Sequence, residues 1–170
     1  FFIFVNMELL KGTIAAQTLK NDIKNSVKSI LSENKRVPHL TAILVGENGA
    51  SKTYVSNKIK ACNEVGFKST VIELDKDISQ HVLMKEIEKL NTDTTIDGIL
   101  VQLPLPKQIN EQEIVSHINA NKDVDGFHPI NAGLLAIGDL DRALIPCTPF
   151  GSMLLLKEAA QTLNLILKFF

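Results

Sequence analysis

Four side chains with useful chemistry occupy distinctive places in the sequence: Tyr54, Lys58, Gln102 and Asp125. Tyr54 and Lys58 are four residues apart, so both would lie on one face of a helix. A buried amine relays protons near neutral pH once its pKa is lowered, and an ionised carboxylate accepts two adjacent N–H groups.

Each of these residues also has an ordinary structural explanation. Lys58 alone would be a solvated helix lysine, and Tyr54 would lie at the edge of an amphipathic helix. Gln102 would be the first loop residue after a buried strand. Asp125, within Lys-Asp-Val-Asp-Gly, would be a turn former. None of the four indicates a function by itself, so the fold must bring them together.

The other reactive groups are given structural roles. Ser51 is expected to be a helix N-cap, since no histidine is placed to activate it as a nucleophile. Cys147 is expected to be a small core residue. The four histidines lack the short spacings that place two ligands on one helix face, so we expect no metal. Two distant cysteines form no disulfide framework, which favours an intracellular, cytoplasmic protein.

Hydrophobic periodicity predicts an alternation of strands and helices. Continuous apolar runs, typical of strands covered on both faces, occur at 40–45 and 96–101. The predicted order is helix 13–35, strand 40–45, helix 51–65 ended by Gly66, strand 67–74, helix 80–90, strand 96–101 and helix 111–118. This order predicts a three-layer α/β/α domain with a mostly parallel sheet.

The candidate residues are expected at one edge of that sheet. Ligands of open parallel sheets bind at the carboxyl ends of the strands. Residues 46–51 leave the first strand there, and residues 102–106 leave the third. Residues 121–149 are rich in Asp, Gly, Asn and Pro and are expected to form a long ordered loop with a helical turn or two, before a helix that resumes at Phe150.

Bulk composition restricts the class of protein. The 170 residues, 45% of them hydrophobic, suffice for one domain with a real core. The formal net charge of -1 gives no broad positive field, so we expect no nucleic-acid partner. The apolar stretch at the C-terminus is too short to cross a membrane by itself, so we expect no membrane association.

Four blocks carry a family resemblance. They are, in order, Val45-Gly-Glu-Asn-Gly-Ala-Ser-Lys-Thr-Tyr-Val-Ser-Asn-Lys58, Asp97-Gly-Ile-Leu-Val-Gln-Leu-Pro-Leu-Pro106, Lys122-Asp-Val-Asp-Gly-Phe127 and Pro146-Cys-Thr-Pro149. Together they resemble the signature stretches of the bifunctional methylenetetrahydrofolate dehydrogenase/cyclohydrolase family. The resemblance implies oxidation of methylenetetrahydrofolate to a methenyl cation, with NADP or NAD as hydride acceptor, and hydrolysis of that cation to formyltetrahydrofolate.

The resemblance also implies roles for individual residues. Lys58 is implied to be catalytic, with Gln102 as a neutral partner that orients the lysine and the attacking water without holding the lysine charged. Tyr54 is implied to be a catalytic residue, with its ring as a platform for the folate rings and its hydroxyl near the reaction centre. Asp125 is implied to anchor the pterin through its two carboxylate oxygens. Pro104, in the loop after Gln102, is implied to form an apolar wall for the substrate.

The resemblance ends before the cofactor domain. Family members continue into a Rossmann-type domain with a Gly-Arg-Ser-like turn, whereas no Gly-x-Gly-x-x-Gly occurs in this chain. We divide the chain into an N-terminal extension (1–6), a folate-binding catalytic domain (7–160) and a non-family apolar tail (161–170). We expect no cofactor-binding residues here, an impaired dehydrogenase step, and a homodimer for the intact protein.

Three interpretations follow. The favoured one is an incomplete chain of an enzyme of this family. The second is a non-catalytic folate-binding or dimerisation module, which would bind a folate analogue without turning over methenyltetrahydrofolate. The third is an unrelated signalling domain of the receiver kind. Receiver domains need an acidic cluster at the strand ends, and the strands here end in Gly46, Asp75 and Gln102, which fits poorly.

Overall fold

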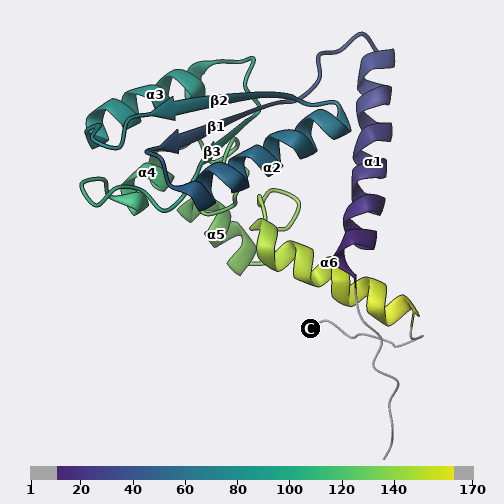
Figure 1. The fold of residues 1–170 in the computed structure, drawn as a ribbon. Helices are drawn as coiled ribbons and strands as arrows, with labels where there is room; N and C mark the ends of the chain where they lie inside the picture. The colour runs from purple at the N-terminus through teal and green to yellow at the C-terminus, as the bar shows by residue number, and fades with distance from the viewer. Residues whose placement is uncertain (1–10, 163–170) are drawn as a thin grey trace, which may run out of the picture.

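A computed structural model describes residues 11–162 of the chain (Figure 1). Its elements are α1 (Gly12–Ser32), β1 (His39–Val45), α2 (Gly49–Val65), β2 (Lys68–Leu74), α3 (Gln80–Thr92), β3 (Gly98–Val101), α4 (Glu111–His117), α5 (Pro129–Ala136) and α6 (Cys147–Thr162). Each helix and strand predicted from the sequence is present, with boundaries shifted by a few residues. The predicted extension at 1–6 and most of the predicted tail at 161–170 lie outside the described residues.

The three strands form one parallel sheet in the order β2-β1-β3. Successive side chains of β1 point to opposite faces, as the strand geometry requires. Ile43 and Val45 pack beneath α3 and α4, while Ala42 and Leu44 pack against α2. Helices cover both faces, so β3 and residues 42–45 of β1 are apolar and buried throughout, and the three-layer prediction is confirmed.

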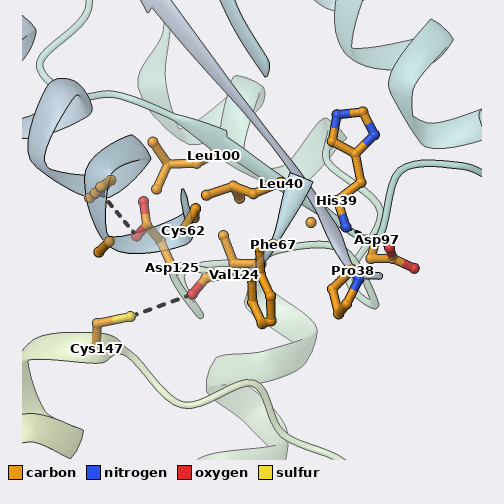
Figure 2. A pocket seen from close by; sticks show the side chains of 13 residues that line it. Pro38, His39, Leu40, Cys62, Phe67, Asp97, Leu100, Val124, Asp125 and Cys147 are labelled. Carbon is orange, nitrogen blue, oxygen red and sulfur yellow. Dashed lines mark hydrogen bonds and ion pairs between the residues drawn. The ribbon is translucent and has the colours of Figure 1, made fainter. Parts of the chain in front are cut away.

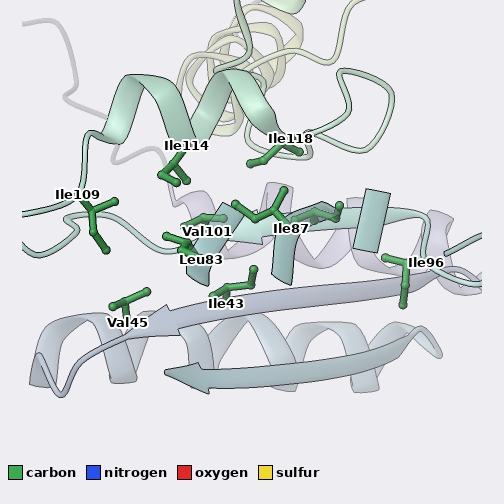
Figure 3. Packing of buried hydrophobic residues seen from close by; sticks show 10 residues of the cluster. Ile43, Val45, Leu83, Ile87, Ile96, Val101, Ile109, Ile114 and Ile118 are labelled. Carbon is green, nitrogen blue, oxygen red and sulfur yellow. The ribbon is translucent and has the colours of Figure 1, made fainter. Parts of the chain in front are cut away.

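The face beneath α3 and α4 holds the larger core (Figure 3). Leu83 and Ile87 come from α3 and Ile114 from α4, and all three are 0% exposed. Complete burial of one such side chain contributes about 1.5–3 kcal/mol. The opposite face has a smaller core, in which Val55 of α2 meets Leu100 of β3.

The start of helix α2 corrects the sequence prediction, and its end agrees with it. Helix α2 begins at Gly49, and its N-cap is Asn48, whose side chain accepts hydrogen bonds from the backbone N–H groups of Ala50 and Ser51. The prediction that Ser51 is the N-cap was therefore wrong, because Asn48 already supplies the capping oxygen. Gly66, with a φ of 90°, ends this helix as predicted.

Outside the sheet, the predicted long loop is more regular than its composition suggests. It contains the eight-residue helix α5, in agreement with the expected helical turns, and α6 begins at Cys147 rather than at Phe150. In α1, only Val27 is buried, while Ile14 and Leu31 are exposed, so the predicted amphipathic face is only partly covered. No helix within residues 11–162 combines the length and apolar character needed to span a bilayer.

Candidate active site

Helix α2 places Lys58 over the sheet. Val55 and Ile59, on either side of Lys58, pack into the smaller core and fix the rotation of the helix. Lys58 thereby reaches residues 122–126, a segment that lies beside β3 and pairs with it through Ile99 and Asp123. The Nζ of Lys58 lies 3.7 Å from Oδ1 of Asp125 in this segment. The structure thus brings together two of the four predicted site residues, 67 positions apart in the chain.

Lys122 anchors the segment that carries Asp125. The Lys122 Nζ donates hydrogen bonds to the backbone carbonyls of Leu90, Asn91 and Asp93 at 2.8–2.9 Å. Carbonyls at the C-terminus of a helix lack intrahelical partners, so a cation here satisfies them and complements the helix dipole. The sequence interpretation had assigned no role to Lys122.

Asp123 is a second residue whose role was missed. Its side chain is buried, and Oδ2 accepts hydrogen bonds from the backbone N–H of His128 and from Nδ2 of Asn131. Asn131 also donates to the carbonyl of Ala120 and accepts from the N–H of Leu144. Asp123 and Asp125 are two residues apart, so alternation along an extended segment would have predicted that they point to the same side. In the structure Asp123 binds groups at the start of α5, whereas Asp125 faces Lys58.

Gly126 lets a distant segment approach Asp125. Its φ is 70°, and a Cβ atom here would lie 2.5 Å from the carbonyl oxygen of Leu144. Only glycine fits this position, because a side chain would collide with the backbone. The close approach brings Cys147 beside the site, where its Sγ lies 3.6 Å from the carbonyl oxygen of Val124.

A cavity of about 400 Å³ lies between α2, the starts of β1 and β3, and this segment. It is therefore at the amino ends of these strands, whereas the sequence predicted a ligand site at their carboxyl ends. Figure 2 shows Asp125 at one end of the cavity and Pro38 and Asp97 at the other. Its lining residues are Pro38, His39, Leu40, Lys58, Ala61, Cys62, Phe67, Asp97, Gly98, Leu100, Val124, Asp125 and Cys147. A mostly apolar pocket of this size with a few polar groups at its two ends suits a small ring-shaped ligand.

The end of the cavity that holds Asp125 has an unusual electrostatic environment. Burial raises the pKa of the Asp125 carboxyl, and the nearby Asp123 carboxylate adds to the rise, while Lys58 opposes it. Burial also raises the pKa of the Cys147 thiol, with a further contribution from Asp125. Although the thiol is partly buried, most of the Cys147 residue is exposed, and it lines the cavity. The prediction that Cys147 is a core residue was therefore wrong.

Gln102 and Tyr54 lie outside the cavity lining. Gln102 continues the sheet by donating its backbone N–H to the carbonyl of Ile43. Its side-chain Nε2 donates to the carbonyl of Leu103 at 2.7 Å, and its Oε1 is buried with no partner among the described residues. Tyr54 is 63% exposed, one helical turn before Lys58. Within the described part of the chain, no hydrogen bond joins Gln102 to Lys58.

The loop after β3 has the shape that its prolines impose. The peptide bond between Leu103 and Pro104 is cis, and Pro104 is exposed. The carboxylate of Glu111 accepts a hydrogen bond from the backbone N–H of Leu105, which ties the loop to the start of α4. Pro104 is absent from the lining of the cavity, so its predicted role as an apolar wall stays a prediction.

A match to a family model shows which protein family this chain belongs to. The model of the family described as tetrahydrofolate dehydrogenase/cyclohydrolase, catalytic domain, matches residues 10–125. This chain belongs to the tetrahydrofolate dehydrogenase/cyclohydrolase family. The match includes Tyr54, Lys58, Gln102 and Asp125, the four residues on which the family resemblance depends.

Curated relatives in the tetrahydrofolate dehydrogenase/cyclohydrolase family are considerably longer than this chain. The bifunctional protein FolD of Flavobacterium johnsoniae is 49% identical over 152 residues, which are 89% of this chain and 51% of that protein. FolD of a Sulfurihydrogenibium species is 52% identical over the same length, with 53% of that protein covered. The chain therefore spans about half the length of these relatives.

Solved structures of the family share the fold described above. FolD of Campylobacter jejuni superposes with a TM-score of 0.86 at 46% identity, covering 90% of this chain and 54% of that one. The Trypanosoma brucei enzyme, solved with NADP cofactor and an inhibitor, superposes with a TM-score of 0.85 at 32% identity, covering 90% and 52%.

Proposed function

We propose that this chain provides the folate-binding, catalytic half of a methylenetetrahydrofolate dehydrogenase/cyclohydrolase. The observation that supports this most strongly is the meeting of Lys58 and Asp125 on the wall of one cavity. An amine and a carboxylate are the groups needed to move a proton and to hold a ring N–H, and the apolar walls suit a flat heterocycle. The proposed substrate is a tetrahydrofolate derivative.

Hydrolysis of the methenyl cation is the step that the residues of this chain could perform. Water adds to the methenyl carbon, one carbon–nitrogen bond breaks, and one proton leaves. In the proposal, Lys58 accepts that proton and Gln102 orients the water through its unpartnered Oε1. Asp125 holds the pterin N–H groups, and the exposed ring of Tyr54 covers the bound folate.

The described residues do not fit the nicotinamide cofactor. A dinucleotide pyrophosphate binds free N–H groups at a helix N-terminus, but Asn48 already accepts from the first N–H groups of α2. The adjoining hollow at the ends of β1 and β2 is lined by three carboxylates, Glu47, Glu73 and Asp75, and one cation, Lys76, so its net negative charge disfavours a phosphate. We therefore derive no hydride-transfer step from this chain.

The proposed cellular setting follows from the cysteines and the surface. Cys62 and Cys147 are both free, which supports a reducing, cytoplasmic compartment.

Three apolar side chains in and after α5 are more than half exposed: Ile130, Ile137 and Leu140. Exposed apolar side chains of this kind support a homodimer or another protein contact, which sedimentation of the purified chain would test.

Two assays on the purified chain test the proposed function. Calorimetric titration with 5-formyltetrahydrofolate measures binding, and loss of the methenyltetrahydrofolate absorbance measures hydrolysis. We expect binding together with hydrolysis above the uncatalysed rate. Binding without hydrolysis would favour the non-catalytic module, and the absence of binding would refute the proposed function.

A further inference from the structure

Helix α5 buries an amide where a helix usually buries apolar side chains. Of its eight residues, all of which the structure describes, only Asn131 is buried, with 1% of its surface exposed. Asparagine is a residue type that is mostly exposed in folded proteins, and the neighbouring Ile130 is 57% exposed. A leucine at position 131 would bury more apolar surface, so the amide indicates a role that depends on hydrogen bonds.

The Asn131 side chain uses both of its N–H donors and its oxygen. Nδ2 donates to the backbone carbonyl of Ala120 at 2.9 Å and to Oδ2 of Asp123 at 3.0 Å. Oδ1 accepts a hydrogen bond from the backbone N–H of Leu144 at 3.2 Å. A buried amide that is satisfied in this way favours one arrangement of the groups around it. Asn131 therefore ties residues 120–123 to residue 144.

These two segments enclose Asp125. Asp123 comes two positions before it in the chain. On the other side, the carbonyl oxygen of Leu144 lies so near Gly126 that a Cβ atom there would be 2.5 Å away. Asn131 thus holds the chain on both sides of Asp125, although it does not line the cavity itself.

The direction of the Asp125 side chain depends on its backbone. Between residues 11 and 162, no backbone N–H donates to the Asp125 carboxylate, and its ion pair with Lys58 is 3.7 Å long. Both oxygens can therefore accept N–H groups of a ligand, but hydrogen bonds of its own do not orient the carboxylate. Its orientation must follow from the contacts that hold Asp123 and Gly126.

We propose that Asn131 is a positioning residue for the folate anchor: by holding Asp123 and Leu144, it aims the Asp125 carboxylate into the cavity. Without these hydrogen bonds, residues 123–126 can turn, and the carboxylate spends less time in the direction that receives the pterin N–H groups. The anchor then binds more weakly although the carboxylate is still present. This inference rests on the proposed function, and it adds a residue that acts through Asp125 without touching the ligand.

A double-mutant cycle separates positioning from a general effect on the site. Calorimetry measures the binding of 5-formyltetrahydrofolate to the 170-residue chain, to Asn131→Ala, to Asp125→Ala and to the double variant. We expect Asn131→Ala to weaken binding by about tenfold when Asp125 is present, and by less than about twofold in the Asp125→Ala background. An equal loss in the two backgrounds would overturn the proposal, because Asn131 would then act on the site as a whole.

Asn110→Ala is the matched control for the loss of hydrogen bonds. The Asn110 side chain also takes part in three: it accepts from the backbone N–H groups of Gln112 and Glu113, and it donates to the Glu113 carboxylate. Asn110 caps α4, on the opposite face of the sheet, and does not line the cavity. Urea denaturation should show lower stability for Asn110→Ala, while its affinity for the probe stays unchanged. A loss of affinity as large as that of Asn131→Ala would contradict the proposal, since lost stability alone would then explain both.

An exchange of two side chains tests the same contact if Asn131→Ala does not fold. Asn131→Asp places two carboxylates against each other and should weaken binding. Adding Asp123→Asn restores a donor and an acceptor between the two positions, and the N–H of Leu144 keeps its acceptor. We expect the paired variant to bind the probe at least about threefold more tightly than Asn131→Asp. A paired variant that binds no more tightly, whether it folds or not, would contradict the proposal.

Failure of the proposed function gives a different result. If the unmodified chain does not bind the probe, the proposed function fails and the inference fails with it. If the unmodified chain and Asp125→Ala bind equally well, Asp125 is not the anchor and Asn131 has nothing to position. If the unmodified chain binds and Asp125→Ala binds more weakly, while the cycle shows independent effects, the folate site stands and only the role of Asn131 is lost.

Discussion

The two faces of the sheet are built from the same strands but are packed differently. On the face beneath α3 and α4, ten buried apolar side chains form a closed core. On the α2 face, four buried residues form a small core, and beyond it lies a cavity bordered by an ion pair. One face of the sheet thus serves mainly stability, while the other leaves room for a ligand.

The largest effect is expected at Lys58 on the open face. Lys58→Met removes the proposed proton acceptor and should lower the rate of methenyltetrahydrofolate hydrolysis by about 10²–10⁴-fold while folate still binds. The assay follows methenyl absorbance in the purified chain or in a full-length relative carrying the same change. Lys52→Met is the matched control and should keep the unmodified rate. Retained hydrolysis in Lys58→Met would remove Lys58 from its assigned role.

The next largest effect compares leucines on opposite faces. Leu83→Ala empties a fully enclosed site and should lower the free energy of unfolding by about 4–5 kcal/mol. Leu100→Ala widens a cavity that already exists, so the loss should be near the lower end of the range, about 2–3 kcal/mol. Urea denaturation of both variants measures the difference. Equal losses would mean that the two faces are packed alike.

Much of the fold, and two of the site residues, could be predicted from the sequence. The unbroken apolar runs around Ile43 and Leu100 predict strands covered on both faces, and the four family blocks identify Lys58 and Asp125. The contact between them could not be predicted, because it depends on the close approach of Leu144 to Gly126 and on the buried Asp123–Asn131 hydrogen bond. These are long-range packing contacts with no local periodicity. Local propensity also misplaced the N-cap of α2: Asn48 and Ser51, three positions apart, are both good capping residues, and Asn48 is the one that caps the helix.

A smaller effect is expected when the proposed anchor is removed. Asp125→Ala eliminates the two acceptors for the pterin and should weaken binding of 5-formyltetrahydrofolate by about 10–100-fold, the value of one or two charge-assisted hydrogen bonds. Calorimetric titration measures the change. Asp141→Ala is a suitable control, since Asp141 is exposed and does not line the cavity. Unchanged affinity in Asp125→Ala would exclude the anchor role.

The smallest effect concerns pH. Burial raises the pKa of Asp125 in the folded chain above its ordinary value of 3.8, so folding favours the protonated form. The stability that this carboxyl contributes is present below pH 3.8 and is lost as the pH rises through the folded pKa. Asp125→Asn should therefore gain stability relative to the unmodified chain as the pH rises through this window, by less than about 1 kcal/mol. Denaturation series at several pH values measure the difference, and a gain that grows toward acid pH would contradict the sign.

The most direct test of the account is to map where a folate binds. Backbone amide chemical shifts of the labelled chain, recorded during titration with 5-formyltetrahydrofolate, report on both faces at once. We expect the changes to concentrate at Lys58, Leu100, Val124 and Cys147, and to be absent at Ile87 and Ile114. Changes centred beneath α3 and α4, or no changes at all, would contradict the assignment of the α2 face as the folate site.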